Sequence, residues 1–316
     1  MIDSTILNTL FPVFAVIAVG YLATHYEWLE RGFWNGAEKL AYYLLLPTIL
    51  FIKIADSDFS NALNIIPIAS VVLIANLIIF TIVFVWYHLH HPQKADFTAL
   101  MQGSIQTNAA YIGLPVALGI FGQKGLVIYA MLLGVVVPVM NTFVLSFLIY
   151  YDPSKVKEPL FAFLKRVLLH PIVIACLGGL LVSYLDVDIP TVLYKTLSSL
   201  SSAALPIGLL VVGSALNIKA VRSGKYFIGV ATFIKLILLP VVAIWIARWF
   251  DLSAFDAGIA VVYTILPASA ASYLMAKRHG SNASLLAGMI VAQTVAASIT
   301  MPIALAIMDY IFTLPL

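Results

Sequence analysis

Charged residues and cysteine are scarce in this chain. Only 10% of its 316 residues are charged, whereas ordinary globular domains carry roughly a quarter. No segment is polar enough and long enough to form a separate soluble domain. The single cysteine, Cys176, excludes an intramolecular disulfide framework and a cysteine-rich metal site, and we expect it to pack as a small hydrophobic side chain.

The motifs of common enzyme classes are also missing. The sequence contains no GxSxG elbow, no P-loop, no HExxH pair and no dinucleotide fingerprint. The histidines of "HLHHP" lack a carboxylate or cysteine that would complete a metal site, and they fall in an expected inner loop. The sequence therefore predicts neither an enzyme nor a protein that needs a metal, a cofactor or a nucleic-acid partner.

The chain is instead apolar from end to end. Hydrophobic residues make up 62% of it, the mean hydropathy is +1.05, and runs of about 20 residues are long enough to cross a hydrocarbon core. These values predict an all-α integral membrane protein. Ten spans are expected, at residues 5–24, 34–53, 63–86, 97–121, 124–149, 166–185, 190–215, 225–249, 254–277 and 283–311.

Basic residues are distributed unevenly between the loops. If the N-terminus lies outside, twelve of the 17 Lys and Arg residues fall on inner loops and helix ends, and only Lys53, Lys124 and Arg248 fall on the outer side. Cytoplasmic loops of membrane proteins carry such an excess of positive charge. The distribution predicts a protein of the cytoplasmic (inner) membrane with both termini outside.

The connection "YYDPSKVKEPLFAFLKR" divides the chain. It is rich in charge and proline, so we expect a first five-helix repeat at 1–150, a cytoplasmic linker at 151–165 and a second repeat at 166–316. Because each half holds an odd number of spans, the second half starts on the opposite side of the membrane, as in inverted-repeat transporters. Three matched positions support the pairing: Pro47 with Pro206, Trp86 with Trp245, and Leu114-Pro115 with Leu266-Pro267.

Two of the expected spans contain residues that interrupt a helix. The stretch "QTNAAYIGLPVALGIFG" carries Asn108, Gly113 and Pro115, and the stretch "TILPASAASYL" carries Pro267. Proline in a helix interior costs about 3 kcal/mol or more, and freed backbone groups are tolerated in a membrane only against protein or a water-filled cavity. We expect the half-helices after Pro115 and Pro267 to point their positive N-termini at one central region, which suits an anion.

Polar side chains accompany these interruptions. Ser269 and Ser272 offer hydroxyl donors and Asn108 offers an amide, while Asn141 and Gln293 lie in neighbouring spans. Two matched breaks in inverted halves favour a substrate site. The alternative is that the prolines are ordinary kinks and that the polar side chains join helices by hydrogen bonds, which is common in membranes.

No carboxylate is expected at the centre of a span. All 14 acids, Glu38 among them, fall in loops or near span ends. Because cation carriers rely on intramembrane carboxylates, this absence argues against a cation as the transported species and leaves the coupling ion unassigned.

Lys235 lies well inside an expected span. It is either a counter-charge for the substrate or for a moving element, or a structural lysine that snorkels to an interface or bonds carbonyls. The corresponding position in the first half is the neutral Asn76, which favours the structural alternative.

The stretch "IQTNAAYIGLPVALGIFG" resembles the fourth-span signature of the auxin efflux carrier (PIN-like) family, with an asparagine five residues before Gly-x-Pro. The segments "FPVFAVIAVGYL", "LAYYLLLPTILFIKIAD" and "ILPASAASYLMAKRHG" resemble that family too, and the length is similar to its compact prokaryotic branch. The resemblance implies ten helices in two inverted five-helix repeats with crossed broken helices four and nine, a fold shared with bile-acid symporters and cation antiporters. It also implies transport of organic anions, such as auxin, malate or malonate.

The resemblance implies roles for individual residues. Asn108 falls where the family places the amide that meets the substrate carboxylate, Pro115 and Pro267 fall at the crossover prolines, and Asn141 falls where plant members have a substrate-facing tyrosine. Plant members carry an Asp and a Lys in span three, where this chain has only Asn76, so the role of that pair is not transferred. The expected substrate-binding residues are Asn108, Tyr111, Gly113, Pro115, Asn141, Pro267, Ser269, Ser272 and Gln293.

These observations predict a secondary transporter for a small organic anion, a mono- or dicarboxylate or an auxin-like acid. The family fold implies elevator-type alternating access, in which spans three to five and eight to ten move against spans one, two, six and seven. A sodium-coupled symporter of the bile-acid type and a ligand-sensing receptor that does not translocate are the alternatives. We expect outward-facing apolar positions to contact membrane lipids or a second copy in a homodimer.

Overall fold

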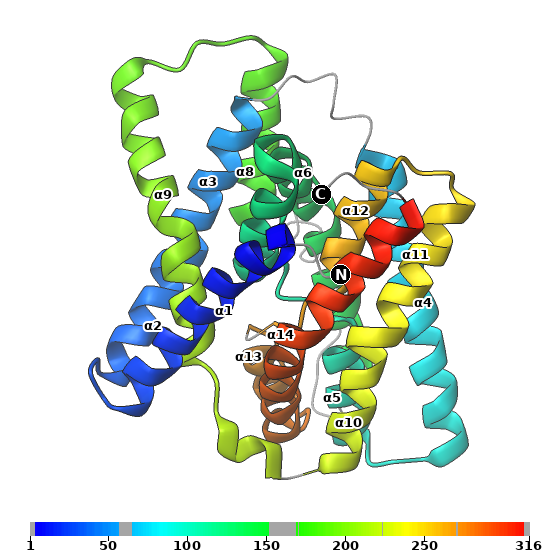
Figure 1. Ribbon diagram of the computed structural model, residues 1–316. Coiled ribbons are helices and arrows are strands. Elements are labelled where there is room, and N and C mark those ends of the chain that lie inside the picture. Colours follow the sequence, from blue (N-terminus) through cyan, green and yellow to red (C-terminus); the bar gives the residue numbers. More distant parts are fainter. Residues whose placement is uncertain are drawn as a thin grey trace.

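The computed structural model describes residues 4–56, 65–151, 169, 171–222, 224–269 and 271–312. Throughout these ranges the regular elements are helices and none is a strand (Figure 1). Within the same ranges, six helical runs are long and apolar enough to cross a membrane, and two shorter apolar helices accompany them. The expected class, an all-helical integral membrane protein, is confirmed. The expected linker at 151–165 lies outside the described residues except for Tyr151.

Helices fill both halves of the chain. The first half contains α1 (Ser4–His25), α2 (Arg31–Leu40), η1 (Ala41–Leu45), α3 (Leu46–Ala55), α4 (Ile65–His90), α5 (Lys94–Ile105), η3 (Ala109–Gly113) and α6 (Leu114–Tyr151). The second half contains α8 (Pro171–Tyr184), α9 (Thr191–Ser214), η4 (Ile218–Arg222), α10 (Lys225–Phe233), η5 (Ile234–Leu238), α11 (Leu239–Trp249), α12 (Ala254–Thr264), α13 (Ala271–Arg278) and α14 (Ala283–Phe312). The elements η1, η3 and η5 are single π-helical turns, and η4 is a 3₁₀ turn.

The helices pack in two groups. In one group α1 lies along α9, and α3 packs against α8 and α9. In the other group α4 contacts α11 and α12, while α14 contacts α5 and α10. Figure 1 shows α3, α8 and α9 at the left and α4, α10 and α11 at the right. The helix α6 contacts members of both groups, so it joins them.

Glycines allow α1 and α9 to pack backbone to backbone. A Cβ atom added to Gly20 would collide with the Leu210 carbonyl, and one added to Gly213 would collide with the Ile17 carbonyl. Such close approach is typical of small residues at membrane helix interfaces. The two helices therefore form a tightly packed pair.

A widened turn precedes three of the prolines inside helices. Pro47, Pro115 and Pro240 each occupy the second position after η1, η3 or η5. Proline cannot donate a backbone hydrogen bond, and its ring clashes with the carbonyl four residues earlier. After η1, the N–H of Leu46 bonds the carbonyl of Ala41, five residues back, which is the π-helical pattern. The wider turn lets each helix continue through its proline.

The long helix α6 bends at Gly122. This residue has φ 66° and ψ −159°, outside the helical region, and glycine adopts such a conformation at little steric cost. The bend separates residues 114–121 from residues 123–151. It falls at the boundary expected between the spans at 97–121 and 124–149.

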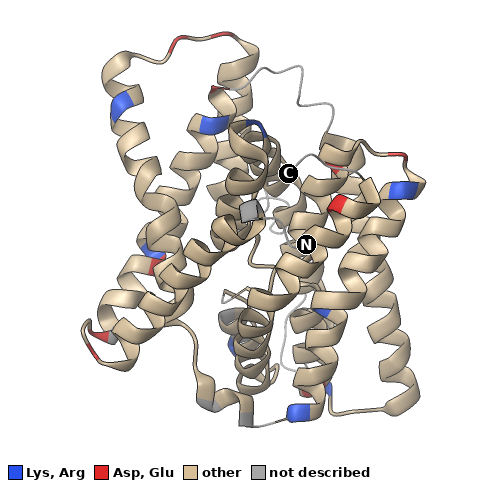
Figure 2. Cartoon of the chain, in the orientation of Figure 1, with Lys and Arg blue, Asp and Glu red and all other residues tan. Residues whose placement is uncertain are grey.

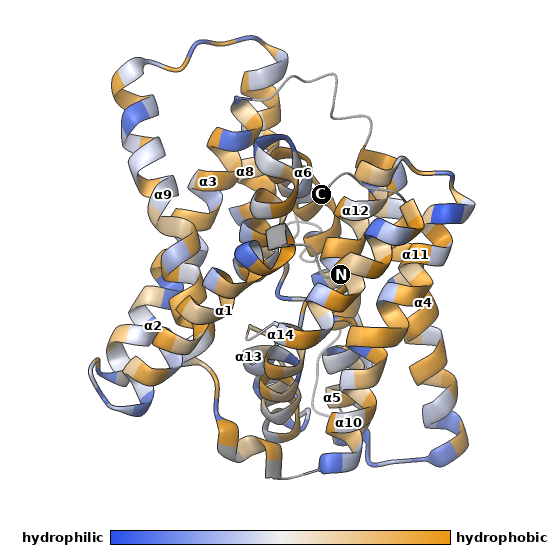
Figure 3. Cartoon of the chain, in the orientation of Figure 1, coloured by the Kyte–Doolittle hydropathy of each residue, from blue (hydrophilic) through white to orange (hydrophobic). Residues whose placement is uncertain are grey.

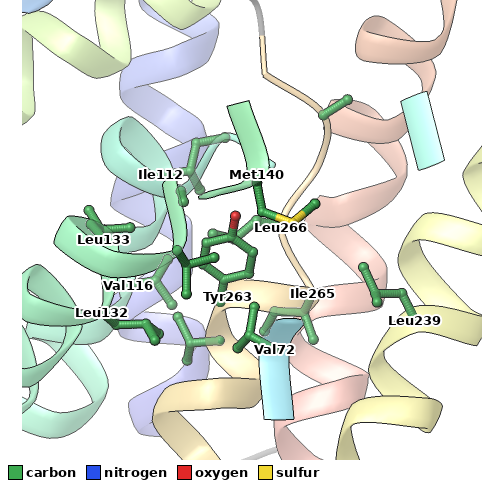
Figure 4. Close-up of a cluster of buried hydrophobic side chains, with 14 of the residues drawn as sticks. Val72, Ile112, Val116, Leu132, Leu133, Met140, Leu239, Tyr263, Ile265 and Leu266 are labelled. Carbon is green, nitrogen blue, oxygen red and sulfur yellow. The ribbon is translucent and has the colours of Figure 1, made fainter. Parts of the chain in front are cut away.

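Buried apolar side chains join α4, α6, α11 and α12. Figure 4 shows Val72, Leu132, Leu239 and Tyr263 in this cluster, and each is at most 2% exposed. Close packing of this kind holds membrane helices together, because lipid tails are as apolar as the side chains and burial alone gives little driving force.

Large apolar side chains also lie on the outside of the bundle. Phe11, Trp245 and Tyr310 are among the most exposed, and Figure 3 shows apolar stretches along the outer helices. Charged residues lie mostly near helix ends and in loops (Figure 2). This pattern is typical of a surface that faces lipid at its middle and water at its ends.

Candidate functional site

The first break separates α5 from η3. The helix α5 ends at Ile105, Gln106 is extended with φ −74° and ψ 140°, and Asn108 precedes η3 with φ −78° and ψ 55°. The helix therefore resumes at Ala109, before Pro115. The prediction that the second half-helix starts after Pro115 is wrong, because the π turn η3 carries the helix through this proline.

The second break separates α12 from α13. The helix α12 ends at Thr264, Pro267 lies in the non-helical segment, and α13 begins at Ala271. The Ser269 hydroxyl accepts a hydrogen bond from the N–H of Ala271 at 3.3 Å, and the Ser269 carbonyl accepts one from the N–H of Ser272 at 3.1 Å. Ser269 thus satisfies N–H groups that the start of a helix leaves without partners. Here the half-helix does start after the proline.

The two breaks contact each other. The backbone N–H of Asn108 donates a hydrogen bond to the carbonyl of Pro267 at 2.9 Å. Gln293 of α14 joins the breaks a second time, since its Oε1 accepts from the N–H of Ala268 at 2.9 Å and its Nε2 donates to the carbonyl of Gly103 at 2.9 Å. The Gln293 side chain is fully buried, so it acts as an interhelical clamp, the alternative weighed for polar residues of neighbouring spans.

A cavity of about 210 Å³ adjoins this crossing. Its lining includes Ala109 at the start of η3 and Ala271 at the start of α13, so two half-helix N-termini face one space. The helix macrodipole makes each N-terminus positive, while the N–H groups of Ala271 and Ser272 at the start of α13 already bond Ser269. Of the expected site residues, Asn108, Tyr111, Asn141, Ser269 and Ser272 line the cavity, whereas Gly113, Pro115, Pro267 and Gln293 are not among its lining residues.

Several polar atoms on the cavity wall have no protein partner. The hydroxyls of Tyr111 and Ser272 are buried and make no hydrogen bond within the part of the chain that the structure describes. The side-chain amide of Asn108 is likewise without a hydrogen-bond partner among the described residues, although the residue is only 3% exposed. Buried polar groups are normally hydrogen-bonded, so these three are candidates to bind a ligand.

Gly113 serves close packing. A Cβ atom at this position would collide with the Tyr129 hydroxyl and with the Leu266 side chain. Gly113 therefore lets η3 lie directly against α6 and the second break. Its role is to bring the two broken segments together, away from the cavity wall.

Lys235 of η5 is fully buried and bonds the first break. Its side-chain nitrogen donates to the hydroxyl oxygen of Thr107, and a second hydrogen bond joins Thr107 to Tyr263. Thr107 and Tyr263 both line the cavity. Lys235 thus does not snorkel to an interface, and its partner is a hydroxyl rather than the carbonyls of the alternative named with snorkelling. Asn76, the position that the expected repeat pairs with Lys235, donates to the Val72 carbonyl of its own helix at 2.8 Å.

A second, larger cavity of about 890 Å³ adjoins the first. Its lining extends from the loop residues Glu27 and Glu30 to Glu38, Tyr111 and Ser269, and the last three also line the smaller cavity. Glu38 lies near the end of its expected span, and it nevertheless lines both cavities. The helix α2 carries this residue from the loop to the junction of the two cavities.

Sequence reasoning did not assign Thr107, Tyr263 or Glu38 to the site. Thr107 precedes Asn108 in the same motif, which is a signal that could have included it. Glu38 and Tyr263 carry no such signal, because an acid near the start of a span and a tyrosine inside one are common in membrane helices.

The described residues offer no metal centre. Within them, no group of three or more His, Cys, Asp or Glu side chains is placed to hold a metal ion. His88 and His90 of the "HLHHP" segment bond their own helix, through Nδ1 and the carbonyls of Phe84 and Trp86 at 2.9 and 3.0 Å. The described lining of the cavity at the crossing offers amides, hydroxyls, helix ends and the Glu38 carboxylate.

Broken helices that cross beside a small cavity are a feature of transporters. The sequence profile of the membrane transport protein family matches residues 5–305. The chain belongs to this family. It is the auxin efflux carrier family that the span-four motif predicted, and both breaks of this membrane transport protein lie within the matched residues.

Two archaeal relatives match most of this membrane transport protein. An uncharacterized transporter from Methanocaldococcus jannaschii is 21% identical over 296 residues, which cover 90% of this chain and 92% of the relative. An uncharacterized transporter from Methanothermobacter thermautotrophicus is 21% identical over 300 residues, which cover 94% of this chain and 96% of the relative. The similarity thus spans both halves of the chain.

Proposed function

We propose that this protein is a secondary transporter that moves a small organic anion, a mono- or dicarboxylate or an auxin-like acid, across the cytoplasmic membrane. The observation that carries the proposal is the crossing, where the Asn108 N–H bonds the Pro267 carbonyl beside a cavity lined by two helix N-termini. Irregular backbone at membrane depth is tolerated only where it is buried in protein or lines a cavity. Transporters with inverted repeats bind substrate at such half-helix ends.

In this proposal the substrate carboxylate binds between the Asn108 amide and the Ser272 hydroxyl, close to both N-termini. A hydrogen bond to a charged group contributes about 1.5–3 kcal/mol, and a helix N-terminus adds about 0.3–2 kcal/mol, depending on burial. Part of this is offset by the cost of immobilising the ligand. The volume of about 210 Å³ is below the roughly 300–1,000 Å³ of pockets for drug-sized ligands, which favours small carboxylates.

The proposal includes ten spans in two inverted five-helix repeats. The run α2–η1–α3 forms span two and the run α10–η5–α11 forms span eight. The broken segments, α5–η3 with residues 114–121 of α6 and α12–α13, occupy positions four and nine. Support comes from the two interrupted segments at corresponding places and from their contact at the crossing. The basic residues favour both termini outside, and the outer apolar side chains would contact lipid or a second copy in a homodimer.

We assign alternating access to an elevator-type movement of α4–α6 and α10–α14 against α1–α3, α8 and α9. The two packing groups support this division. Tyr111 of η3 lies at their boundary, since a Cβ atom on Gly208 of α9 would collide with its ring. The larger cavity reaches Glu27 and Glu30 in a loop on the side assigned to the cytoplasm, so the described conformation is inward-facing in this scheme.

A sodium-coupled symporter is the alternative on the same fold. In symporters, freed carbonyls and half-helix C-terminal ends coordinate the sodium ion. Here the Lys235 nitrogen already occupies the first break and donates to the Thr107 hydroxyl oxygen, so this oxygen is engaged before a cation could coordinate it. This observation favours a sodium-independent carrier. A sensor that binds without translocation has no specific observation in its favour.

Counterflow in proteoliposomes tests the proposal. Vesicles that contain the purified chain are loaded with one unlabelled carboxylate and diluted into the same labelled carboxylate, across a series of mono- and dicarboxylates and indole acids. We expect transient accumulation of label without sodium, and none with Asn108→Ala. Accumulation that needs sodium would indicate a symporter. Binding without exchange would indicate a sensor, and neither binding nor exchange across the series would refute an organic-anion carrier.

A further inference from the structure

The two cavities meet at a neck made of four residues. Glu38, Tyr111, Ser269 and Ala271 line both the larger and the smaller cavity. A solute that moves from one cavity to the other comes close to these residues. Their chemistry therefore bears on which solutes reach Asn108.

Glu38 brings a carboxylate without a partner to this neck. Among the described residues that line the smaller cavity it is the one acid, and none of them is a lysine or an arginine. Within the described ranges, no ion pair or hydrogen bond engages the Glu38 carboxylate. The buried Lys235 is bonded to Thr107 and is not part of the lining.

Three carboxylates belong to the described lining of the larger cavity, those of Glu27, Glu30 and Glu38, and His25 lines the same cavity. Carboxylates on a cavity wall attract ammonium groups and repel anions that come close. An anion on its way from this cavity to the helix ends would pass Glu38.

We propose that the substrate is a small zwitterion of the amino-acid class, whose carboxylate binds at Asn108 and the helix N-termini and whose ammonium group binds Glu38. This inference rests on the proposed transport function and replaces its organic anion by a carboxylate that also carries an ammonium group. A plain anion in the cavity leaves the Glu38 charge unpaired, which is unfavourable in a poorly solvated site. A zwitterion pairs both ends. The rings of Tyr42 and Tyr111 line the same space, and aromatic faces attract ammonium groups.

Matched ligand pairs test the inference. Alanine is compared with propionate, and 4-aminobutyrate with butyrate, in counterflow and in thermal-shift titrations of the full chain. Each pair differs by one amino group. We expect the amino member of at least one pair to act at a roughly tenfold or more lower concentration, because a site built for a charged group discriminates strongly against ligands that lack its partner.

Variants locate the effect. Glu38→Gln keeps the side-chain shape and removes the charge, so the preference within the pair is expected to fall to about twofold or less while the carboxylate still binds. Glu30→Gln, in the lining of the larger cavity only, is the matched control and should keep the preference. If Glu38→Gln does not fold, the comparison within each pair on the unmodified chain decides alone.

The outcomes separate this inference from the transport proposal. Equal action of both members of each pair would overturn the zwitterion assignment and leave an organic-anion carrier. Tighter binding of plain carboxylates by Glu38→Gln would overturn it too, because Glu38 would then repel substrate rather than bind it. Absence of binding and exchange with every amino acid and every carboxylate would overturn both.

Discussion

The side-chain nitrogen of Lys235 donates a hydrogen bond to the hydroxyl of Thr107, the residue before Asn108. The lysine belongs to η5 and the threonine to the first break, so the bond ties one helix to the non-helical segment of another. An unpaired lysine in a membrane costs at least about 2.5–3.5 kcal/mol. The bond offsets part of this cost and holds the segment from which Asn108 reaches the cavity.

Replacing Lys235 by Met is expected to weaken carboxylate binding, because Thr107 and the adjoining Asn108 lose an anchor. Thr107→Val should have a similar effect, and the double variant should lose less than the sum. Side chains in one hydrogen-bond network couple by about 0.5–3 kcal/mol. Calorimetric titration of the four proteins with the carboxylate that exchanges best measures this coupling. Strictly additive losses would show that the two side chains act independently.

The Asn108 amide is expected to contribute directly to affinity. A hydrogen bond to a charged ligand is worth about 1.5–3 kcal/mol, so Asn108→Ala should raise the dissociation constant by roughly 10- to 150-fold. Its melting temperature without ligand should change little. Asn35→Ala is the matched control, because Asn35 lines only the larger cavity. This variant should bind the ligand with unchanged affinity. Unchanged affinity in Asn108→Ala would remove this residue from the site.

Gln293 is expected to matter for the integrity of the crossing. Gln293→Leu leaves the Ala268 N–H and the Gly103 carbonyl without partners, and a buried unsatisfied group costs about 1–3 kcal/mol. The purified protein should therefore melt at a lower temperature. Gln293→Glu retains an acceptor for Ala268 and should recover part of the loss. A Leu variant as stable as the parent would mean that water or a shift of the break replaces both bonds.

The packing of α1 against α9 is expected to depend on Gly213. Gly213→Ala places a methyl group against the Ile17 carbonyl, and overpacking of this kind costs about 1–3 kcal/mol. Gly229→Ala is the same change on α10 at a position with no neighbour within 4 Å, where alanine favours a helix by about 0.5–1 kcal/mol. Thermal unfolding in detergent should show opposite shifts. Equal shifts would contradict the close contact of the two backbones.

Pro115 and Pro267 show which features of the helix breaks can be predicted from the sequence. Proline predicted a break at Pro115 and at Pro267, and only the second lies in a non-helical segment. At Pro115 the preceding π turn absorbs the missing hydrogen bond, and the break falls earlier, at Gln106–Asn108. Whether a helix widens or ends at a proline depends on which residues pack around the backbone groups that the proline leaves without partners. The spacing of residues in the sequence does not show this packing.

Some of the predicted site residues line the cavity, and others bond the protein itself. Asn108, Ser269 and Ser272 were predicted from their position beside a break, and they line the cavity. Gln293 was predicted from its polarity inside an apolar span, but its amide is used by two backbone groups. Polarity predicts that a buried side chain needs a partner. It does not say whether the partner is protein or ligand.

The sequence by itself determined the membrane class, the family and the presence of two interrupted segments, because composition, run length and the span-four motif are local properties of the chain. Only the tertiary structure decided which polar side chains share one space. Glu38, Thr107 and Tyr263 reach it from α2, the first break and α12. The direction of each side chain follows from how its helix is rotated against neighbours distant in sequence, and no single segment specifies that rotation.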